Sequence, residues 1–171
     1  GRKKVLACGG APLRTETEEF FFACGLLVLQ GYGLTEASPL VSFPSPTGFR
    51  FGTVGRVIDG AEVRIAEAGE ICYRGPNVMT GYWGRPDDTA AVLVDGWLHT
   101  GDVGELDEDG YLRITDRIKD LIVTSNGKNV APSPIEALLA VDPLFEYTLL
   151  LGDNRPYLTL LVAPSLPHLE D

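Results

Sequence analysis

The sequence is poor in cysteine and in long hydrophobic runs, and each shortage excludes a class of protein. It has three cysteines, Cys8, Cys24 and Cys72, and none stands in a CxxC or His-paired spacing typical of zinc sites or redox couples. The longest apolar stretch, residues 23–29, is far shorter than the roughly 18–20 residues that span a bilayer. We therefore expect reduced, mostly buried thiols in a cytoplasmic protein without a transmembrane segment.

Positive charge is also scarce. The chain carries 14 Lys and Arg against 24 Asp and Glu, for a net charge of −10. Because binding to a nucleic-acid backbone depends on clustered Lys and Arg, we expect no nucleic-acid partner. Low-complexity segments and repeats are absent, and the 20 Gly and 12 Pro are scattered, which indicates many short elements in a globular chain of 171 residues.

The amino-terminal part has the pattern of a parallel β-α-β unit. Residues 5–8 form a short apolar run that leads into a glycine-rich loop, and residues 18–24 have helical character. A second apolar run, residues 26–30, leads into another glycine-rich loop. Both strands are expected to be buried, as parallel strands usually are. We assign residues 1–45 to the end of a parallel α/β sheet, whose ligands would bind at the carboxyl ends of the strands.

Short strand-like segments follow at close spacing, separated by Gly or Asp-Gly turns. They are EVRIA, GEICYRG, WLHTG, DVGEL and YLRIT. Asp109-Gly110 predicts a hairpin between residues 103–106 and 111–115, because Gly accepts the positive φ of a tight turn. One helix, residues 86–93, interrupts the strands. We predict a small antiparallel β-barrel over residues 46–116, with Trp83 and Trp97 in its core.

The pattern changes after residue 116. Residues 132–140 have the pattern of a short helix, and residues 147–151 and 157–162 that of two strands. The predicted fold class is therefore α/β + β: a large part over residues 1–116, a boundary at residues 117–120, and a partial α+β domain over residues 121–171.

A few polar residues stand where ligands commonly bind. In QGYGLTE, residues 30–36, Tyr32 could stack on a planar base, Thr35 could donate to a phosphate oxygen, and Glu36 could bind Mg²⁺, although such a loop can also be purely structural. Asp102 follows a Thr-Gly pair and could equally cap the start of a strand. Arg117 could be half of a surface ion pair. The lone His99 and His168 are expected to be structural.

Four motifs, in order, carry a family resemblance. They are QGYGLTEAS, GEICYRGPNVMTGYW, GWLHTGD and DGYLRITDRIKDLIVTSNGKNVAPSPIE. Over nearly the whole chain they resemble the adenylate-forming superfamily of acyl-CoA synthetases, luciferases and adenylation domains, and the last is similar to long-chain fatty acyl-CoA synthetases. The resemblance implies an AMP-forming acid–thiol ligase of lipid metabolism, which adenylates a fatty acid with ATP and then transfers it to coenzyme A.

The resemblance also implies an adenine site. Tyr32 would stack on the adenine, beside Gly33 in the same loop. The residues that would line the adenine are Gly9, Gly10 and Ala11.

Phosphate and ribose contacts are implied in the same way. Thr35 would contact the α-phosphate and Glu36 would bind Mg²⁺, and both count as catalytic. Asp102 would accept from the two ribose hydroxyls, and Arg117 would reach the same ribose.

The carboxy-terminal part would act as a lid. Lys119 matches the family's hinge, which makes it a third catalytic position, and the lid would swing about it between adenylate and thioester formation. Gly127 would lie in the loop that approaches the pantetheine of coenzyme A, where a Cβ would crowd the thiol.

The chain departs from the family in two respects. The upstream phosphate loop with its Lys and the Lys near the family's carboxyl terminus do not occur in these 171 residues. We therefore expect a segment of the ligase that is inactive by itself. Two alternatives stay open: a non-catalytic fragment or interaction module, and an acyl-AMP ligase that loads a carrier protein. Peripheral membrane association, a homodimer and the acyl chain length stay open as well.

Overall fold

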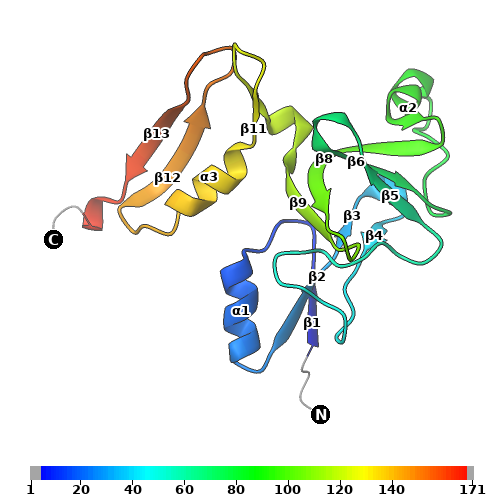
Figure 1. Ribbon diagram of the computed structural model, residues 1–171, viewed down its shortest axis with the longest axis horizontal. Helices are drawn as coiled ribbons and strands as arrows, with labels where there is room; N and C mark the ends of the chain where they lie inside the picture. Colours follow the sequence, from blue (N-terminus) through cyan, green and yellow to red (C-terminus); the bar gives the residue numbers. More distant parts are fainter. Residues whose placement is uncertain (1–4, 169–171) are drawn as a thin grey trace. The chain divides into compact units, whose positions relative to one another are not determined.

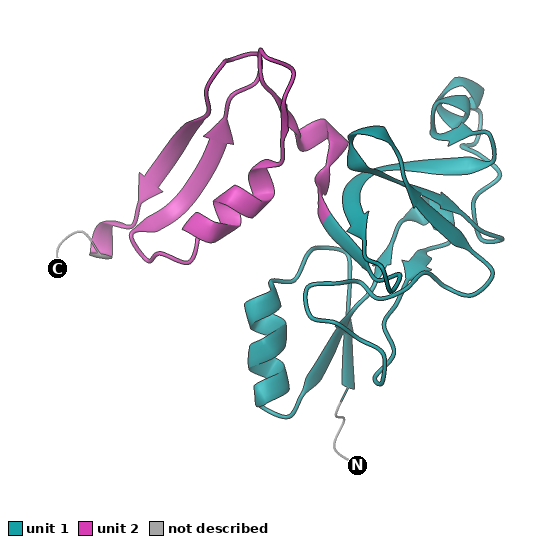
Figure 2. Cartoon of the chain, viewed as in Figure 1, with its two compact units in different colours: residues 1–114 teal, residues 115–171 magenta. Residues whose placement is uncertain are grey.

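A computed structural model of the chain describes residues 5–168. The chain divides into two compact units, residues 1–114 and residues 115–171, which Figure 2 shows in different colours.

The first unit begins with a parallel β-α-β arrangement, as the sequence predicted. Strand β1, Val5–Cys8, pairs in parallel with β2, Leu27–Gln30, and helix α1, Thr15–Ala23, connects them (Figure 1). The last pair in register is Cys8 with Gln30. The loops that follow the two strands therefore leave the sheet side by side.

The predicted burial of β1 is wrong for this chain. Val5 is 42% exposed and Leu6 is 40% exposed, although both have the apolar character of a buried strand. The physical reason is that β1 and β2 form a two-stranded sheet among the described residues. Further layers are needed to cover both faces of a parallel sheet.

A buried carboxylate connects α1 to the loop after β4, Leu40–Ser42. Glu18 is 3% exposed, and its Oε2 accepts a hydrogen bond from the Gly52 N–H at 2.7 Å. Burial raises the pKa of Glu18, with a smaller contribution from the charge of Glu19, while the Gly52 N–H opposes the shift. The folded state therefore holds the Glu18 proton more tightly than the unfolded state does.

Glu18→Gln should raise the midpoint of thermal unfolding at pH 7, because it removes a buried negative charge and keeps an acceptor for Gly52. In the wild type, stability should fall as the pH rises from about 4.3, the ordinary pKa of Glu, through the raised pKa of the folded state. Melting curves from pH 4 to pH 8 test this, with the exposed Glu16→Gln as control. Equal pH profiles for Glu18→Gln and wild type would contradict the assignment.

The predicted antiparallel strands form one five-stranded sheet. Its strands are β5 Glu62–Ile65, β6 Glu70–Arg74, β7 Leu93–Val94, β8 Trp97–Leu106 and β9 Leu112–Arg117. The order is β5-β6-β8-β7, and β9 also pairs with β8. This pairing does not close into the expected barrel within residues 5–168. Helix α2, Pro86–Val92, comes directly before β7.

Strand β8 is continuous where the sequence suggested two strands. Gly101 has a φ of +71°, and the register of β6 against β8 shifts between Glu70 and Cys72. A glycine at such an irregularity bends a strand without ending it. The predicted hairpin turn follows, with Gly110 at a φ of +81° and the Asp107 carboxylate accepting N–H groups of Asp109 and Tyr111 at 3.0 and 2.8 Å.

The core of the first unit lies along the middle of this sheet. Its fully buried large side chains include Ile71 and Tyr73 of β6, Leu98 of β8 and Leu112 of β9. The two tryptophans are not in this core, contrary to prediction. Trp83 is fully exposed, and Trp97 lies beneath the guanidinium groups of Arg64 and Arg74, each 4.5 Å from the ring centroid. Trp97 is the first residue of β8, whereas Trp83 lies in a turn outside the strands.

The second unit is a small α+β arrangement, as predicted. Helix α3 packs on strand β12, where Glu136 Oε1 accepts the Leu150 N–H at 2.7 Å (Figure 1). The elements are η3 Ile118–Asp120, β10 Ile122–Val123, β11 Asn129–Val130, α3 Pro132–Leu139, β12 Phe145–Leu151, β13 Thr159–Pro164 and η4 Leu166–His168. Strands β12 and β13 are antiparallel. Within the described residues, every helix is too short or too polar to cross a membrane.

Candidate functional site

The loop after β1 lies against the loop after β2. The Gly31 N–H donates to the Cys8 carbonyl at 2.9 Å. A Cβ on Gly9 would lie 3.2 Å from the Gly31 carbonyl oxygen, and Gly10 has a φ of +91°. The two glycines thus allow the two backbones to run close together at the carboxyl ends of the parallel strands, with Ala11 exposed just beyond them.

Two of the predicted site residues, far apart in sequence, meet in the first unit. The Tyr32 hydroxyl donates to Asp102 Oδ2 at 2.7 Å, and Asp102 is 5% exposed. The bend of β8 places this carboxylate: the Asp102 N–H donates to Thr100 Oγ1 at 3.1 Å, and the Thr100 hydroxyl donates to the Ile71 carbonyl at 2.7 Å. A buried carboxylate and an aromatic ring therefore lie next to each other.

Gly33 makes the fold of the Tyr32 loop possible. Strand β3, Tyr32–Gly33, pairs with β4, and the register shifts between its two residues. A Cβ on Gly33 would lie 1.8 Å from the Pro39 carbonyl oxygen and 3.1 Å from the Leu40 Cα. These are backbone atoms that cannot rotate away, so no other residue type fits at Gly33.

Thr35 and Glu36 lie on a short helical turn that is held by hydrogen bonds from a neighbouring segment. The turn is η1, Thr35–Ala37, and its last residue is fully buried. The Glu36 carbonyl accepts the Met79 N–H at 2.8 Å. Asn77 donates its side-chain amide to the carbonyls of Ala37 and Leu40, the latter at 2.8 Å. The segment around Asn77 therefore fixes the turn that carries Thr35 and Glu36.

Tyr82 holds the Glu36 carboxylate. Its hydroxyl donates to Glu36 Oε1 at 2.7 Å. This hydrogen bond, with burial and the negative charge of Glu36, raises the pKa of Tyr82, so the phenol stays protonated and remains a donor. Neither Asn77 nor Tyr82 had a predicted role, although both lie in the GEICYRGPNVMTGYW motif. A carboxylate oriented in this way offers the hard oxygen ligand that Mg²⁺ prefers.

The other predicted site residues belong to the second unit. Arg117 ends β9, and Lys119 lies in η3. Gly127 has a φ of +77° and donates its N–H to the Thr124 carbonyl at 2.8 Å, while a Cβ added there would meet nothing within 4 Å. Within this unit, the positive φ explains why residue 127 is a glycine.

Comparison with known proteins identifies the family. Residues 1–83 match the family model of the AMP-binding enzyme, and residues 119–170 match that of the AMP-binding enzyme C-terminal domain. The long-chain-fatty-acid–CoA ligase FadD15 of Mycobacterium bovis is 41% identical over 163 residues, which are 95% of this chain and 27% of that protein. The human long-chain-fatty-acid–CoA ligase ACSBG1 is 39% identical over 162 residues, 91% of this chain and 22% of that protein.

Solved structures have the same fold. The O-succinylbenzoate coenzyme A synthetase MenE from Bacillus subtilis, in complex with AMP, matches 94% of this chain and 36% of its own with 30% identity and a TM-score of 0.81. The ATP-bound RpMatB-BxBclM chimera B1 matches 96% of this chain and 37% of its own with 32% identity and a TM-score of 0.82.

The chain thus spans 27% or less of the ligases described above. The matches nevertheless cover nearly all of it, in sequence and in fold. The chain belongs to the adenylate-forming superfamily of AMP-binding enzymes.

Proposed function

We propose that this chain is the nucleotide-holding segment of an ATP-dependent long-chain fatty acid–CoA ligase. The observation that carries the proposal is the 2.7 Å hydrogen bond between Tyr32 and the buried Asp102, which joins two of the family's motifs. The identity of about 40% with long-chain-fatty-acid–CoA ligases supports the substrate class. The three cysteines are free thiols, which fits a cytoplasmic enzyme.

The nucleoside would be held by an aromatic face and a charged acceptor. The Tyr32 ring would stack on the adenine, and the loop from Gly9 to Ala11 would border it. A carboxylate has about four acceptor positions, so the Asp102 carboxylate can accept from several donors together; the Tyr32 hydroxyl is one of them, and the ribose hydroxyls would be others. Its burial strengthens each of these hydrogen bonds, because the surroundings screen charge less than water does.

The phosphates would meet the turn that carries Thr35 and Glu36. Thr35 is exposed and can donate its hydroxyl to an α-phosphate oxygen. Glu36, held by the Tyr82 hydroxyl, would bind Mg²⁺, which when bound offsets the charge of the phosphates. The chain would thus contribute positioning and charge stabilisation of the adenylation step, with no covalent role for its side chains.

The second unit would supply the lid. We propose that Arg117 also contacts the ribose, that Lys119 is the hinge, and that Gly127 lies in the loop that approaches coenzyme A. The C-terminal family model begins at residue 119, which supports a division at this point. A hinge needs a few residues that change their φ and ψ angles between the two half-reactions.

Lys119→Pro in a full-length enzyme with this sequence should spare acyl-adenylate formation and lower thioester formation by at least about 10-fold. Proline fixes φ near −65° and restricts the preceding residue, so a hinge there could not turn. Pyrophosphate release measures the first half-reaction, and transfer of a radiolabelled fatty acyl group measures the second.

Lys119→Ala is the matched control, because it removes the side chain and leaves the backbone free. Equal loss of both half-reactions in Lys119→Pro would contradict the hinge. Fatty acid must stimulate pyrophosphate release in the wild type for the proposed function to stand. Transfer to a phosphopantetheinyl carrier protein in place of coenzyme A would favour the acyl-AMP ligase.

A further inference from the structure

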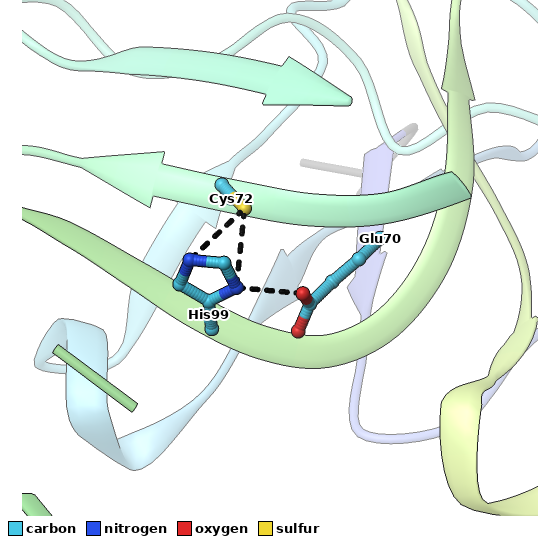
Figure 3. A group of neighbouring side chains, drawn as sticks. All are labelled: Glu70, Cys72 and His99. Atoms are coloured by element: carbon cyan, nitrogen blue, oxygen red, sulfur yellow. Dashed lines mark hydrogen bonds and ion pairs between the residues drawn. The ribbon is translucent and has the colours of Figure 1, made fainter. Parts of the chain in front are cut away.

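Three side chains with metal-binding atoms converge on one face of the β6–β8 pair (Figure 3). Glu70 and Cys72 are two residues apart on β6, so their side chains point to the same side of the sheet. His99 lies directly opposite Cys72 on β8, since the two are partners in register. This His–Cys pair was not predicted, because a pairing across strands has no fixed spacing along the chain.

The three side chains of this cluster are in contact. His99 Nδ1 lies 2.6 Å from Glu70 Oε2 and 3.6 Å from Cys72 Sγ, and His99 Nε2 lies 3.9 Å from the same sulfur. All the ligand atoms lie within 4.8 Å of one another. One ion could therefore reach a sulfur, a nitrogen and an oxygen together.

The distances fit a tetrahedral ion of the zinc type. Bonds of about 2.3 Å to sulfur and about 2.0–2.1 Å to nitrogen, at a tetrahedral angle, separate the two ligand atoms by about 3.6 Å. The observed distance from Cys72 Sγ to His99 Nδ1 is 3.6 Å. The separation of nitrogen and carboxylate oxygen would have to open from 2.6 Å to about 3.3 Å, a shift that a Glu side chain can make by rotation.

The surroundings hold the ligands in place. Glu70 Oε1 accepts the Gly101 N–H at 3.1 Å, so an outer hydrogen bond already orients the carboxylate. Cys72 is buried, while the side chain of His99 is 28% exposed, which leaves a path for an ion from the histidine side. Arg64 lies opposite Cys72 on β5 and interacts with the Cys72 sulfur. A bound ion would take the place of the Arg64 guanidinium as the positive charge beside this sulfur.

We propose that Glu70, Cys72 and His99 form a binding site for one zinc-class divalent cation, with a fourth coordination position left to water. A thiolate and an imidazole favour Zn²⁺ over Mg²⁺ or Ca²⁺, which prefer oxygen ligands. The site is separate from Glu36, and it requires neither a nucleotide nor the proposed ligase activity.

Cobalt titration of the 171-residue chain tests this site. The chain, without a polyhistidine tag and with its thiols reduced, should bind one equivalent of Co²⁺ and develop a thiolate-to-cobalt charge-transfer absorption. Zn²⁺ should abolish that absorption by displacement, because Zn²⁺ has the higher affinity for such ligands. Cys72→Ser should remove the absorption, and Cys24→Ser, at an exposed thiol, should keep it.

Two further variants keep the test decisive if Cys72→Ser does not fold. His99→Gln and Glu70→Gln, at partly exposed positions, should each lower Co²⁺ affinity by at least about 10-fold while circular dichroism stays native. The proposal is overturned if the folded wild type shows no charge-transfer absorption, or if Cys24→Ser or Cys8→Ser abolishes it. It is also overturned if His99→Gln and Glu70→Gln bind Co²⁺ as tightly as the wild type.

Discussion

Replacing Asp102 by Asn lowers the rate of acyl-adenylate formation by about 100-fold in a full-length enzyme that carries this sequence. A hydrogen bond to a charged group contributes about 1.5–3 kcal/mol, and about 2.7 kcal/mol corresponds to a 100-fold change in rate. Asn has nearly the shape of Asp, and its amide oxygen can still accept from Tyr32. Its NH₂ group cannot accept from a ribose hydroxyl, so the loss reports on the ribose contact.

Pyrophosphate release under saturating fatty acid is the measurement for Asp102→Asn. The control is Glu108→Gln, which removes a charge from the exposed hairpin turn of the same sheet and should leave the rate unchanged. Circular dichroism must show that Asp102→Asn is folded, because its carboxylate is buried. Turnover equal to that of the control would contradict the assignment of Asp102 to the ribose.

The second large effect concerns Gly33. Gly33→Ala should reduce the free energy of unfolding by about 3 kcal/mol or more, because its Cβ would lie 1.8 Å from the Pro39 carbonyl oxygen. The loop can avoid the clash only by giving up the register of Gly33 with Leu40. Since Tyr32 and Thr35 lie within two residues of Gly33, nucleotide binding should weaken together with stability.

Urea unfolding measures the loss in Gly33→Ala. Gly96→Ala is the matched control, since Gly96 has a φ of +78° and a Cβ there would meet nothing within 4 Å. Its cost should be about 1–2 kcal/mol, from the left-handed conformation, whereas Gly33 has no positive φ and its cost would come from the clash. A loss in Gly33→Ala no greater than in Gly96→Ala would mean that the loop adjusts and that the Tyr32 turn is not rigid.

Local signals in the sequence predicted most of the elements. Asp109-Gly110 placed the hairpin and the apolar run 5–8 placed β1, because turn chemistry and periodicity act over a few residues. Whether a face is covered depends on other segments, and so the exposure of Val5 and Trp83 was not predictable. The continuity of β8 through Gly101 was missed for a related reason, since a glycine can bend a strand or end it.

The residues of the candidate site were chosen from motifs, whereas the contacts between them depend on the fold. Tyr32 and Asp102 were singled out by residue type and by family resemblance, yet their hydrogen bond joins residues 70 positions apart. The roles of Asn77 and Tyr82 follow only from contacts with the Glu36 turn. The cluster of Glu70, Cys72 and His99 depends on strand register, which a spacing rule along one chain does not contain.

The most direct test of the nucleotide site is calorimetric titration of the 171-residue chain with AMP and with 2′,3′-dideoxy-AMP, in wild-type and Asp102→Asn forms. If Asp102 accepts from the ribose hydroxyls, the wild type should bind AMP at least about 10-fold more tightly than the dideoxy analogue. Asp102→Asn should bind the two nucleotides equally weakly. A wild type that does not bind AMP, or does not distinguish it from the dideoxy analogue, would contradict the account.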